Sequence, residues 1–307
     1  MSTPPDARWT RRRFLARSTG ASVGALLAPG AIPLLQATPL GGPAGIQLYA
    51  VKDELRADPA RTLRTIAQIG FGEVEAAGLA GLPVSEFRKL LDDANLRCPS
   101  AHLQFDARDP GPAFEEAHAL GAHYAASGSL RDAVAAAART GPPLAPAAQG
   151  MTLDEARRTA ELANRIGEEA RRSGLQYVYH NHDFEFAAES ATCGYDVLLK
   201  ETEPALVQFE IDCGWMVLGG RDPREYFAHY PGRFPMVHVK DFLPVAARGA
   251  GHPGAELGHG MIDYGPIFAV AEKSGLKHYF AEQEGPFTRM SQLDAARQAY
   301  DYLRNIK

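Results

Sequence analysis

Short apolar runs alternate with amphipathic stretches from Gly45 to the end of the chain. This alternation is typical of repeated strand–helix units around a parallel sheet. Eight units in a chain of 307 residues favour closure into a single-domain (β/α)₈ TIM barrel over an open, doubly wound sheet. The strands are predicted at Gly45–Ala50, Glu73–Ala76, Cys98–Phe105, His123–Ser127, Gln176–His182, Val207–Asp212, Met236–Lys240 and His278–Glu282.

Glycines mark the points where the predicted helices give way to strands. Gly70, Gly174 and Gly275 each precede an apolar residue that opens a strand, and glycine supplies the left-handed turn that ends a helix. The helix predicted at Thr152–Ser173 begins with a capping-box pattern, Thr-Leu-Asp-Glu. The Ala- and Pro-rich segment Arg131–Gly150 breaks the rhythm, and we interpret it as a surface excursion within the barrel domain.

The first 38 residues differ from the rest of the chain. Arg11, Arg12 and Arg13 are followed by an apolar segment and then by small residues, which resembles a twin-arginine export signal. Glycine and proline interrupt the apolar segment, which is already short for a membrane helix. The sequence therefore predicts a signal and linker at 1–38, a barrel domain at 39–307, an exported or periplasmic location, and no stable membrane span in the mature form.

The charge and cysteine content of the chain argue against nucleic-acid binding and against a zinc–cysteine site. The formal net charge is -5, and the chain lacks a run of Lys or Arg beyond the N-terminus, so the basic surface that nucleic-acid binding needs is missing. Cys98, Cys193 and Cys213 form no CxxC pair and no even framework. Neither a zinc–cysteine site nor a disulfide scaffold is indicated, although a single bridge stays open. The oligomeric state is left open.

Polar residues gather at the C-terminal ends of the predicted strands, where barrel enzymes form their sites. Residues two apart on a strand share a face. Three such pairs are His180 with His182, His238 with Lys240, and Glu282 with Glu284.

Four residues on the last four strands form a candidate metal site. If His180, Asp212, His238 and Glu282 point into the barrel, two imidazoles and two carboxylates converge. This ligand set suits Mn²⁺, Co²⁺, Fe²⁺ or Zn²⁺, so a divalent ion is the expected cofactor. The alternative for each residue alone is a hydrogen-bonded polar side chain at a strand end.

The neighbouring residues offer acid–base chemistry. An ion that holds a carbonyl and an adjacent hydroxyl lowers the cost of removing the proton between them. Glu282 or Glu284 is positioned to take that proton, and His182 or Lys240 to return it or to protonate a leaving oxygen.

Other residues are candidates for substrate contacts. His102 and Glu185 are expected to bind hydroxyls, with a solvated or hydrogen-bonded rim position as the alternative. Trp215, with Tyr177 and Tyr179, is a candidate sugar-stacking surface, although aromatic residues on strands are more often core.

These motifs, in this order, resemble the sugar phosphate isomerase/epimerase superfamily of xylose isomerase-like barrels. The resemblance implies a Glu-Asp-His-Glu metal set on strands five to eight, which maps to His180, Asp212, His238 and Glu282. Gly258-His-Gly-Met-Ile-Asp263 resembles the Gly-x-Gly-x-Ile-Asp loop that follows the seventh strand of the family.

Two departures shape the expected activity. His180 replaces a carboxylate that ketose epimerases use as ligand and acid/base, and Trp215 stands near the place of a substrate-binding His. We expect a metal-dependent isomerase or epimerase that acts on a sugar or keto-sugar by proton abstraction. A lyase acting on 3-keto-glycosides is the alternative, followed by an endonuclease IV-like phosphodiesterase and a non-catalytic carbohydrate-binding barrel. Export argues against a phosphorylated substrate.

Overall fold

The computed structural model describes residues 41–104, 109–128, 130, 150–187, 192–244, 254–285, 287 and 289–306. The predicted export signal at 1–38 lies outside the described residues, as does the predicted excursion Arg131–Gly150 except for its last residue. Both therefore stay predictions.

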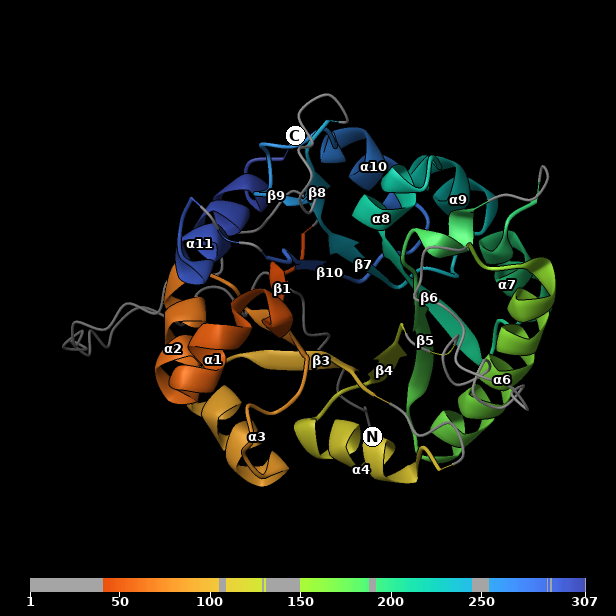
Figure 1. The fold of residues 1–307 in the computed structure, drawn as a ribbon. Helices are drawn as coiled ribbons and strands as arrows, with labels where there is room; N and C mark the ends of the chain where they lie inside the picture. The colour runs from red at the N-terminus through yellow and green to blue at the C-terminus, as the bar shows by residue number, and fades with distance from the viewer. Residues whose placement is uncertain are drawn as a thin grey trace, which may run out of the picture. The chain divides into compact units, whose positions relative to one another are not determined.

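Eight parallel strands close into a barrel (Figure 1). Their order is β1-β10-β7-β6-β5-β4-β3-β2, and β1 pairs with both β2 and β10. The prediction of a single-domain (β/α)₈ barrel is confirmed. The barrel strands are β1 (Gly45–Gln47), β2 (Glu73–Ala76), β3 (Arg97–His102), β4 (Tyr124–Ser127), β5 (Gln176–His180), β6 (Val207–Asp212), β7 (Met236–Val239) and β10 (His278–Ala281).

All eight barrel strands begin within one residue of their predicted start, and several end earlier than predicted. The first strand stops at Gln47, where a 3₁₀ helix, η2 (Leu48–Val51), takes over. The side chain of Gln47 accepts a hydrogen bond from the backbone N–H of Tyr49 and so caps that turn. Buried apolar residues continue through η2, which is why the sequence pattern does not show where the strand ends.

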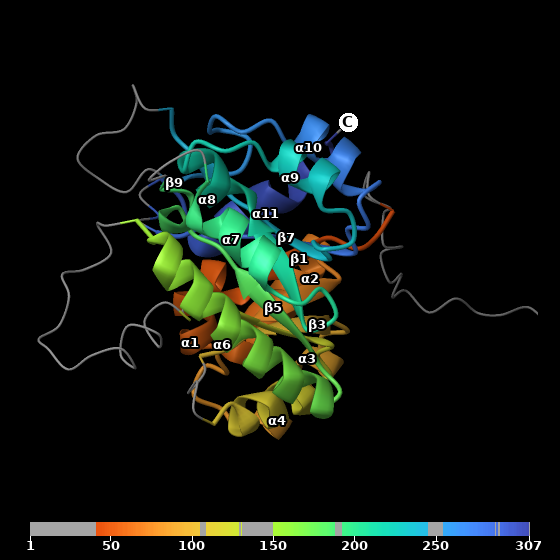
Figure 2. The same cartoon turned by 90° about the vertical axis from the view of Figure 1, so that its right-hand side faces the viewer.

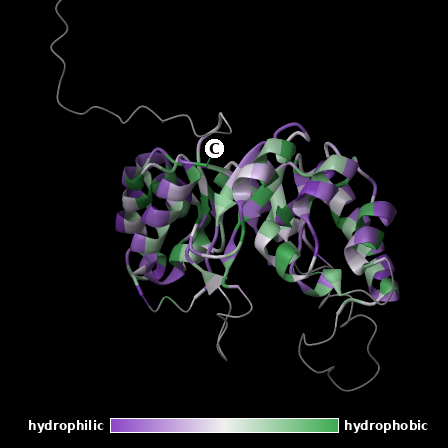
Figure 3. Cartoon of the chain, turned by 90° about the horizontal axis from the view of Figure 1, so that it is seen from above, coloured by the Kyte–Doolittle hydropathy of each residue, from purple (hydrophilic) through white to green (hydrophobic). Residues whose placement is uncertain are grey.

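Helices surround the barrel (Figures 1 and 2). Hydrophobic and hydrophilic residues alternate along them (Figure 3), as expected of helices with one face on a sheet. None of the helices in the described ranges is long and apolar enough to cross a membrane. The helices are α1 (Lys52–Ala57), α2 (Pro59–Ile69), α3 (Val84–Asp93), α4 (Gly111–Leu120), α6 (Leu153–Arg172), η3 (Phe184–Phe186), α7 (Gly194–Glu201), α8 (Cys213–Leu218), α9 (Pro223–His229), α10 (Tyr264–Ala271) and α11 (Gln292–Leu303).

The predicted helix ends are confirmed. Thr152 and Glu155 form the reciprocal capping box at the start of α6. Gly70, Gly174 and Gly275 have positive φ angles of 126°, 77° and 95°, the region in which residues with a Cβ are strained.

The barrel interior changes from apolar to polar along the strands. Near the middle lies a buried cluster formed by Tyr124, Ala126, Val178, Met236 and Phe280. Two residues further along their strands come His180, His238 and Glu282, all buried. Because side chains repeat with a period of two, the same face that packs the core carries the polar residues at the C-terminal end.

The loop after β7 is held by one carboxylate. Asp241 lies in β8 (Asp241–Phe242), which pairs antiparallel with β9 (Gly254–Ala255). Its oxygens accept hydrogen bonds from the backbone N–H groups of Phe242, Gly258, Gly260 and Ile262 at 2.9 to 3.2 Å. A Cβ at Gly260 would lie 2.0 Å from Asp241 Oδ1. The glycines of the Gly-x-Gly-x-Ile-Asp loop thus allow the chain to wrap around Asp241.

We expect Asp241→Ala to lower the free energy of unfolding by about 3 kcal/mol, because it leaves several backbone N–H groups near a buried position without an acceptor. Urea unfolding followed by circular dichroism measures the loss. Asp263→Ala is the matched control, since Asp263 accepts one N–H bond at the start of α10 and its loss costs about 1 kcal/mol. Equal losses in both variants would contradict the anchoring role of Asp241.

Candidate functional site

A cavity of about 680 Å³ opens at the C-terminal ends of the barrel strands. Gln47 and Tyr49 border it on one side. Five predicted site residues line it: His102, His180, His182, Glu282 and Glu284. The structure therefore brings half of the ten sequence-predicted site residues to the wall of one cavity.

Lys240 lies among three carboxylates at this mouth. Its Nζ is 3.1 Å from Asp212 Oδ2, 2.9 Å from Glu282 Oε2 and 2.6 Å from Glu284 Oε1. Burial alone would lower the pKa of Lys240, but the three carboxylates outweigh it and raise this pKa. Lys240 is thus a charged ammonium group, and it also lies 5.0 Å from the ring centre of Trp215.

Asp212 is held in place by its local backbone. Its Oδ1 accepts a hydrogen bond from the N–H of Trp215 at 2.8 Å and caps α8, which leaves Oδ2 facing Lys240. The side chain of Asn181 bonds both the N–H and the C=O of Asp212. Burial raises the pKa of Asp212 to about 6 against the opposing effect of Lys240.

Asp212, His238 and Glu282 offer ligand atoms that all lie within 4.8 Å of one another. We call these three residues the mouth set. His238 presents Nδ1 to this set, 2.9 Å from Glu282 Oε2. Two carboxylates and one imidazole are a donor set that suits a divalent ion such as Mn²⁺ or Zn²⁺.

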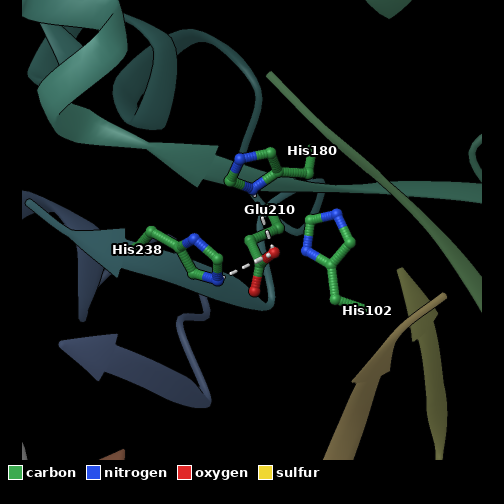
Figure 4. Close-up of side chains that lie close together, drawn as sticks. All are labelled: His102, His180, Glu210 and His238. Atoms are coloured by element: carbon green, nitrogen blue, oxygen red, sulfur yellow. Dashed lines mark hydrogen bonds and ion pairs between the residues drawn. The ribbon is translucent and has the colours of Figure 1, made fainter. Parts of the chain in front are cut away.

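A second group lies next to the mouth set and shares His238 with it. Ligand atoms of His102, His180, Glu210 and His238 also lie within 4.8 Å of one another, and we call these residues the deep set. Figure 4 shows the Glu210 carboxylate between the three imidazoles. Glu210 Oε2 is 3.2 Å from His180 Nδ1 and 3.1 Å from His238 Nε2.

Glu75 borders the deep set. Its Oε2 lies 2.7 Å from His238 Nε2, and its Oε1 accepts a hydrogen bond from Ser100 Oγ at 2.6 Å. Burial would raise the pKa of Glu75, but His238 and His102 lower it to about 2. Burial and the neighbouring Glu75 instead raise the pKa of Glu210 to about 7. Burial lowers the pKa of His180 well below its usual value, so its imidazole is neutral.

His182 and Glu185 are linked through the backbone after β5. Burial and Lys240 lower the pKa of His182 to about 4, so its ring is neutral. The fully buried Glu185 accepts hydrogen bonds from the N–H of His182 at 2.9 Å and from Tyr179 O–H at 2.8 Å. Burial raises the pKa of Glu185 to about 8. Glu185 positions the His182 segment here, and its predicted contact with substrate stays a prediction.

The three aromatic residues predicted as a sugar-stacking surface lie in two different places, the barrel wall and the C-terminal mouth of the barrel. Tyr177 and Tyr179 are buried in the barrel wall, so they are core residues and not a stacking surface. Trp215 is partly buried and packs against Phe242 and near His182, with ring centres 4.8 and 6.0 Å apart. The open question about a disulfide is answered as well, because all three cysteines are buried and free.

The family described as "Xylose isomerase-like TIM barrel" matches residues 63–306. The chain belongs to this family. An inosose dehydratase from Lacticaseibacillus casei is 32% identical over 165 residues, which are 50% of this chain and 55% of that protein. The chain thus spans about half the length of the curated relatives that it matches.

Solved structures of the same barrel type superpose on most of the chain. A sugar phosphate isomerase/epimerase from Parabacteroides distasonis ATCC 8503 has a TM-score of 0.65 and 25% identity, and the match covers 86% of this chain and 95% of that one. The IOLI protein, whose structure holds a zinc atom, has a TM-score of 0.62 and covers 85% of this chain and 96% of that one. At 11% identity, the second likeness shows the fold alone.

The family resemblance predicted four metal ligands, one on each of the last four barrel strands. The structure brings three of these four residues into one group. Asp212, His238 and Glu282 form the mouth set, whereas His180 belongs to the deep set. The separation has a geometric reason: His180 is level with Glu210 in the β5–β6 register, two residues before Asp212.

Glu75 and Glu210 were not predicted as site residues. The sequence does contain a pattern that indicates both, because each lies two positions from another acidic residue on its strand. Glu75 follows Glu73 on β2, and Glu210 precedes Asp212 on β6, each two residues away. Applying the same-face rule to these strands, as to the pairs on the fifth, seventh and eighth, would have placed both carboxylates in the barrel.

Proposed function

We propose that this chain is a metal-dependent enzyme that removes the proton next to the carbonyl of a polyhydroxy ketone and eliminates water from the neighbouring carbon. The observation that carries the proposal is the contact between Lys240 and Glu284 beside the mouth set. Elimination needs a base and an acid close together, and this pair supplies both. The similarity to inosose dehydratase supports a cyclic polyhydroxy ketone as the substrate class.

The mouth set fits a divalent ion by its chemistry. Only Oδ1 of Asp212 accepts the helix-capping hydrogen bond, so Oδ2 can bind an ion. Ligand atoms of His238 and Glu282 lie within 4.8 Å of the Asp212 carboxylate. Such an ion polarises a carbonyl oxygen and so stabilises the negative charge that develops when the adjacent proton leaves.

The chain's own residues account for the proton transfers. The Glu284 carboxylate lines the cavity and takes the proton from the carbon next to the carbonyl. The C–H electron pair forms the new C=C bond, and the C–O bond of the neighbouring hydroxyl breaks. The Lys240 ammonium donates the proton with which that hydroxyl leaves as water. His182, neutral and facing the cavity, binds a substrate hydroxyl.

Epimerisation is the second candidate, because it shares the first step. Glu284 and His182 line the same cavity, so Glu284 can remove a proton, and His182 can return one to the opposite face after it has taken up a proton from solvent. The 25% identity to a sugar phosphate isomerase/epimerase over most of the chain supports this alternative.

An assay in deuterium oxide separates these outcomes. The purified protein with Mn²⁺ is incubated with inososes, ketosugars and 3-keto-glycosides, and the products are followed by NMR and mass spectrometry. Loss of water with deuterium exchange supports elimination, and inversion with exchange supports epimerisation. Turnover with no deuterium at any carbon would refute proton abstraction as the first step.

We expect Asp212→Asn to weaken Mn²⁺ binding by roughly 100-fold, because a direct ligand matters at least as much as the residues that orient ligands. Titration calorimetry with Mn²⁺ measures the change, and turnover in the same variant should fall with it. Glu116→Gln is the matched control, since Glu116 lines the cavity outside the mouth set. Wild-type Mn²⁺ affinity in Asp212→Asn would overturn the assignment.

A further inference from the structure

Two carboxylates are buried in the barrel without a lysine or arginine beside them. Glu75 and Glu210 have no solvent exposure. Among the described residues, their ion-pair partners are imidazoles only: His102, His180 and His238. Burying two carboxylates is costly unless protons or positive charge lie close by, and a bound cation is one such source of charge.

One imidazole can supply part of that charge, because His238 contacts Glu75, Glu210 and Glu282. The ring centres of His180 and His238 are 4.5 Å apart, and His102 lies 5.0 Å from the first and 6.2 Å from the second. Protonating more than one of them would place like charges at these short distances. A single divalent cation, in contrast, balances two carboxylates and leaves all three rings neutral.

The donor atoms have the identity and spacing of a cation site. Three imidazoles and one carboxylate offer ligand atoms within 4.8 Å of one another. Glu210 Oε1 is buried and has no hydrogen-bond partner among the described residues, so one oxygen remains for an ion while Oε2 contacts His180 and His238. Figure 4 shows this carboxylate facing the space between the rings.

We propose that His102, His180, Glu210 and His238 form a second divalent-cation site, next to the mouth set and sharing His238 with it. Its three nitrogen donors select Zn²⁺ or Co²⁺ over Mg²⁺ and Mn²⁺, which prefer oxygen ligands. Glu75 supplies the second negative charge from its place beside His238.

His238 belongs to both sets. A neutral imidazole has one free lone pair, so His238 serves the deep ion through Nε2 when Nδ1 carries the hydrogen. That hydrogen then faces Glu282 Oε2, 2.9 Å away. Filling the deep site therefore leaves the mouth with the carboxylates of Asp212 and Glu282, and Zn²⁺ should weaken Mn²⁺ binding by taking His238 without occupying Asp212 or Glu282.

Titration of the metal-free full chain with Zn²⁺ tests the proposal, with elemental analysis after dialysis as a second measurement. We expect one tight Zn²⁺ event in the wild type. Glu210→Gln and His102→Gln should each weaken it by roughly 100-fold. His102 is partly exposed at the strand end, so the second variant keeps the test valid if the first one fails to fold. Asp212→Asn is the matched control and should keep the tight Zn²⁺ event.

Three outcomes would overturn the second site. The first is wild-type Zn²⁺ affinity in both Glu210→Gln and His102→Gln. The second is loss of the tight event in Asp212→Asn, which would leave a single site at the mouth and the proposed function intact. The third is the absence of a tight Zn²⁺ event in the wild type. Failure of the proposed function is recognised separately, by turnover without deuterium exchange.

Discussion

Glu284→Gln is expected to lower the rate of substrate C–H exchange with solvent by roughly 10²- to 10⁴-fold, the usual contribution of a positioned base. An amide of the same shape accepts no proton, whereas the mouth set keeps all its ligands, so Mn²⁺ affinity should stay at the wild-type level. Deuterium incorporation followed by NMR, together with Mn²⁺ titration, measures the two effects in one preparation.

Glu282→Gln is the informative comparison, because Glu282 belongs to the mouth set, and both Glu282 and Glu284 contact Lys240 and line the cavity. This variant should lose both Mn²⁺ binding and exchange. If Glu284→Gln exchanges at the wild-type rate, the base lies elsewhere, and His182 is the next residue to test.

The barrel was predictable because its pattern is repeated. Each βα unit carries an apolar run and an amphipathic stretch, and an error of a few residues in one unit does not change the count. The strand ends were less predictable. Gln47 ends β1 by capping a 3₁₀ turn with its own side chain, and this local hydrogen bond leaves no mark in the hydrophobic pattern.

Part of the composition of the site was predictable, whereas Glu75, Glu210 and the division into two sets were not. The rule that residues two apart share a face placed His180, His238 and Glu282 inside the barrel, as the structure shows. Height within the barrel depends on the register between neighbouring strands. That register puts His180 level with Glu210 and Asp212 level with His238, and such pairing is set by the packing of the whole sheet.

Lys240 shows most clearly what a strand pattern leaves out. The sequence places it on the face of His238, but only the folded chain shows that its ammonium group contacts Asp212, Glu282 and Glu284. Two of these three carboxylates belong to the mouth set. Lys240 and a divalent ion therefore compete for the same negative charge, and the lysine has to share Asp212 and Glu282 with any ion that binds there.

Lys240→Met consequently has opposite effects on binding and on catalysis. Methionine keeps an unbranched apolar stem and removes the charge, so Mn²⁺ affinity at the mouth set should rise roughly tenfold or more as the competing cation disappears. Turnover should fall by about 10²- to 10⁴-fold, because the proton donor to the leaving hydroxyl is lost.

Mn²⁺ titration and an assay of water elimination measure both effects of Lys240→Met. Lys277→Met is the matched control, since Lys277 is exposed and precedes β10 at the opposite end of the barrel. Tighter Mn²⁺ binding with unchanged turnover would remove Lys240 from the reaction and leave it as a charge that balances Asp212, Glu282 and Glu284. Unchanged Mn²⁺ binding would mean that the ion does not use Asp212 and Glu282, and the mouth set would then lose its role as the metal centre.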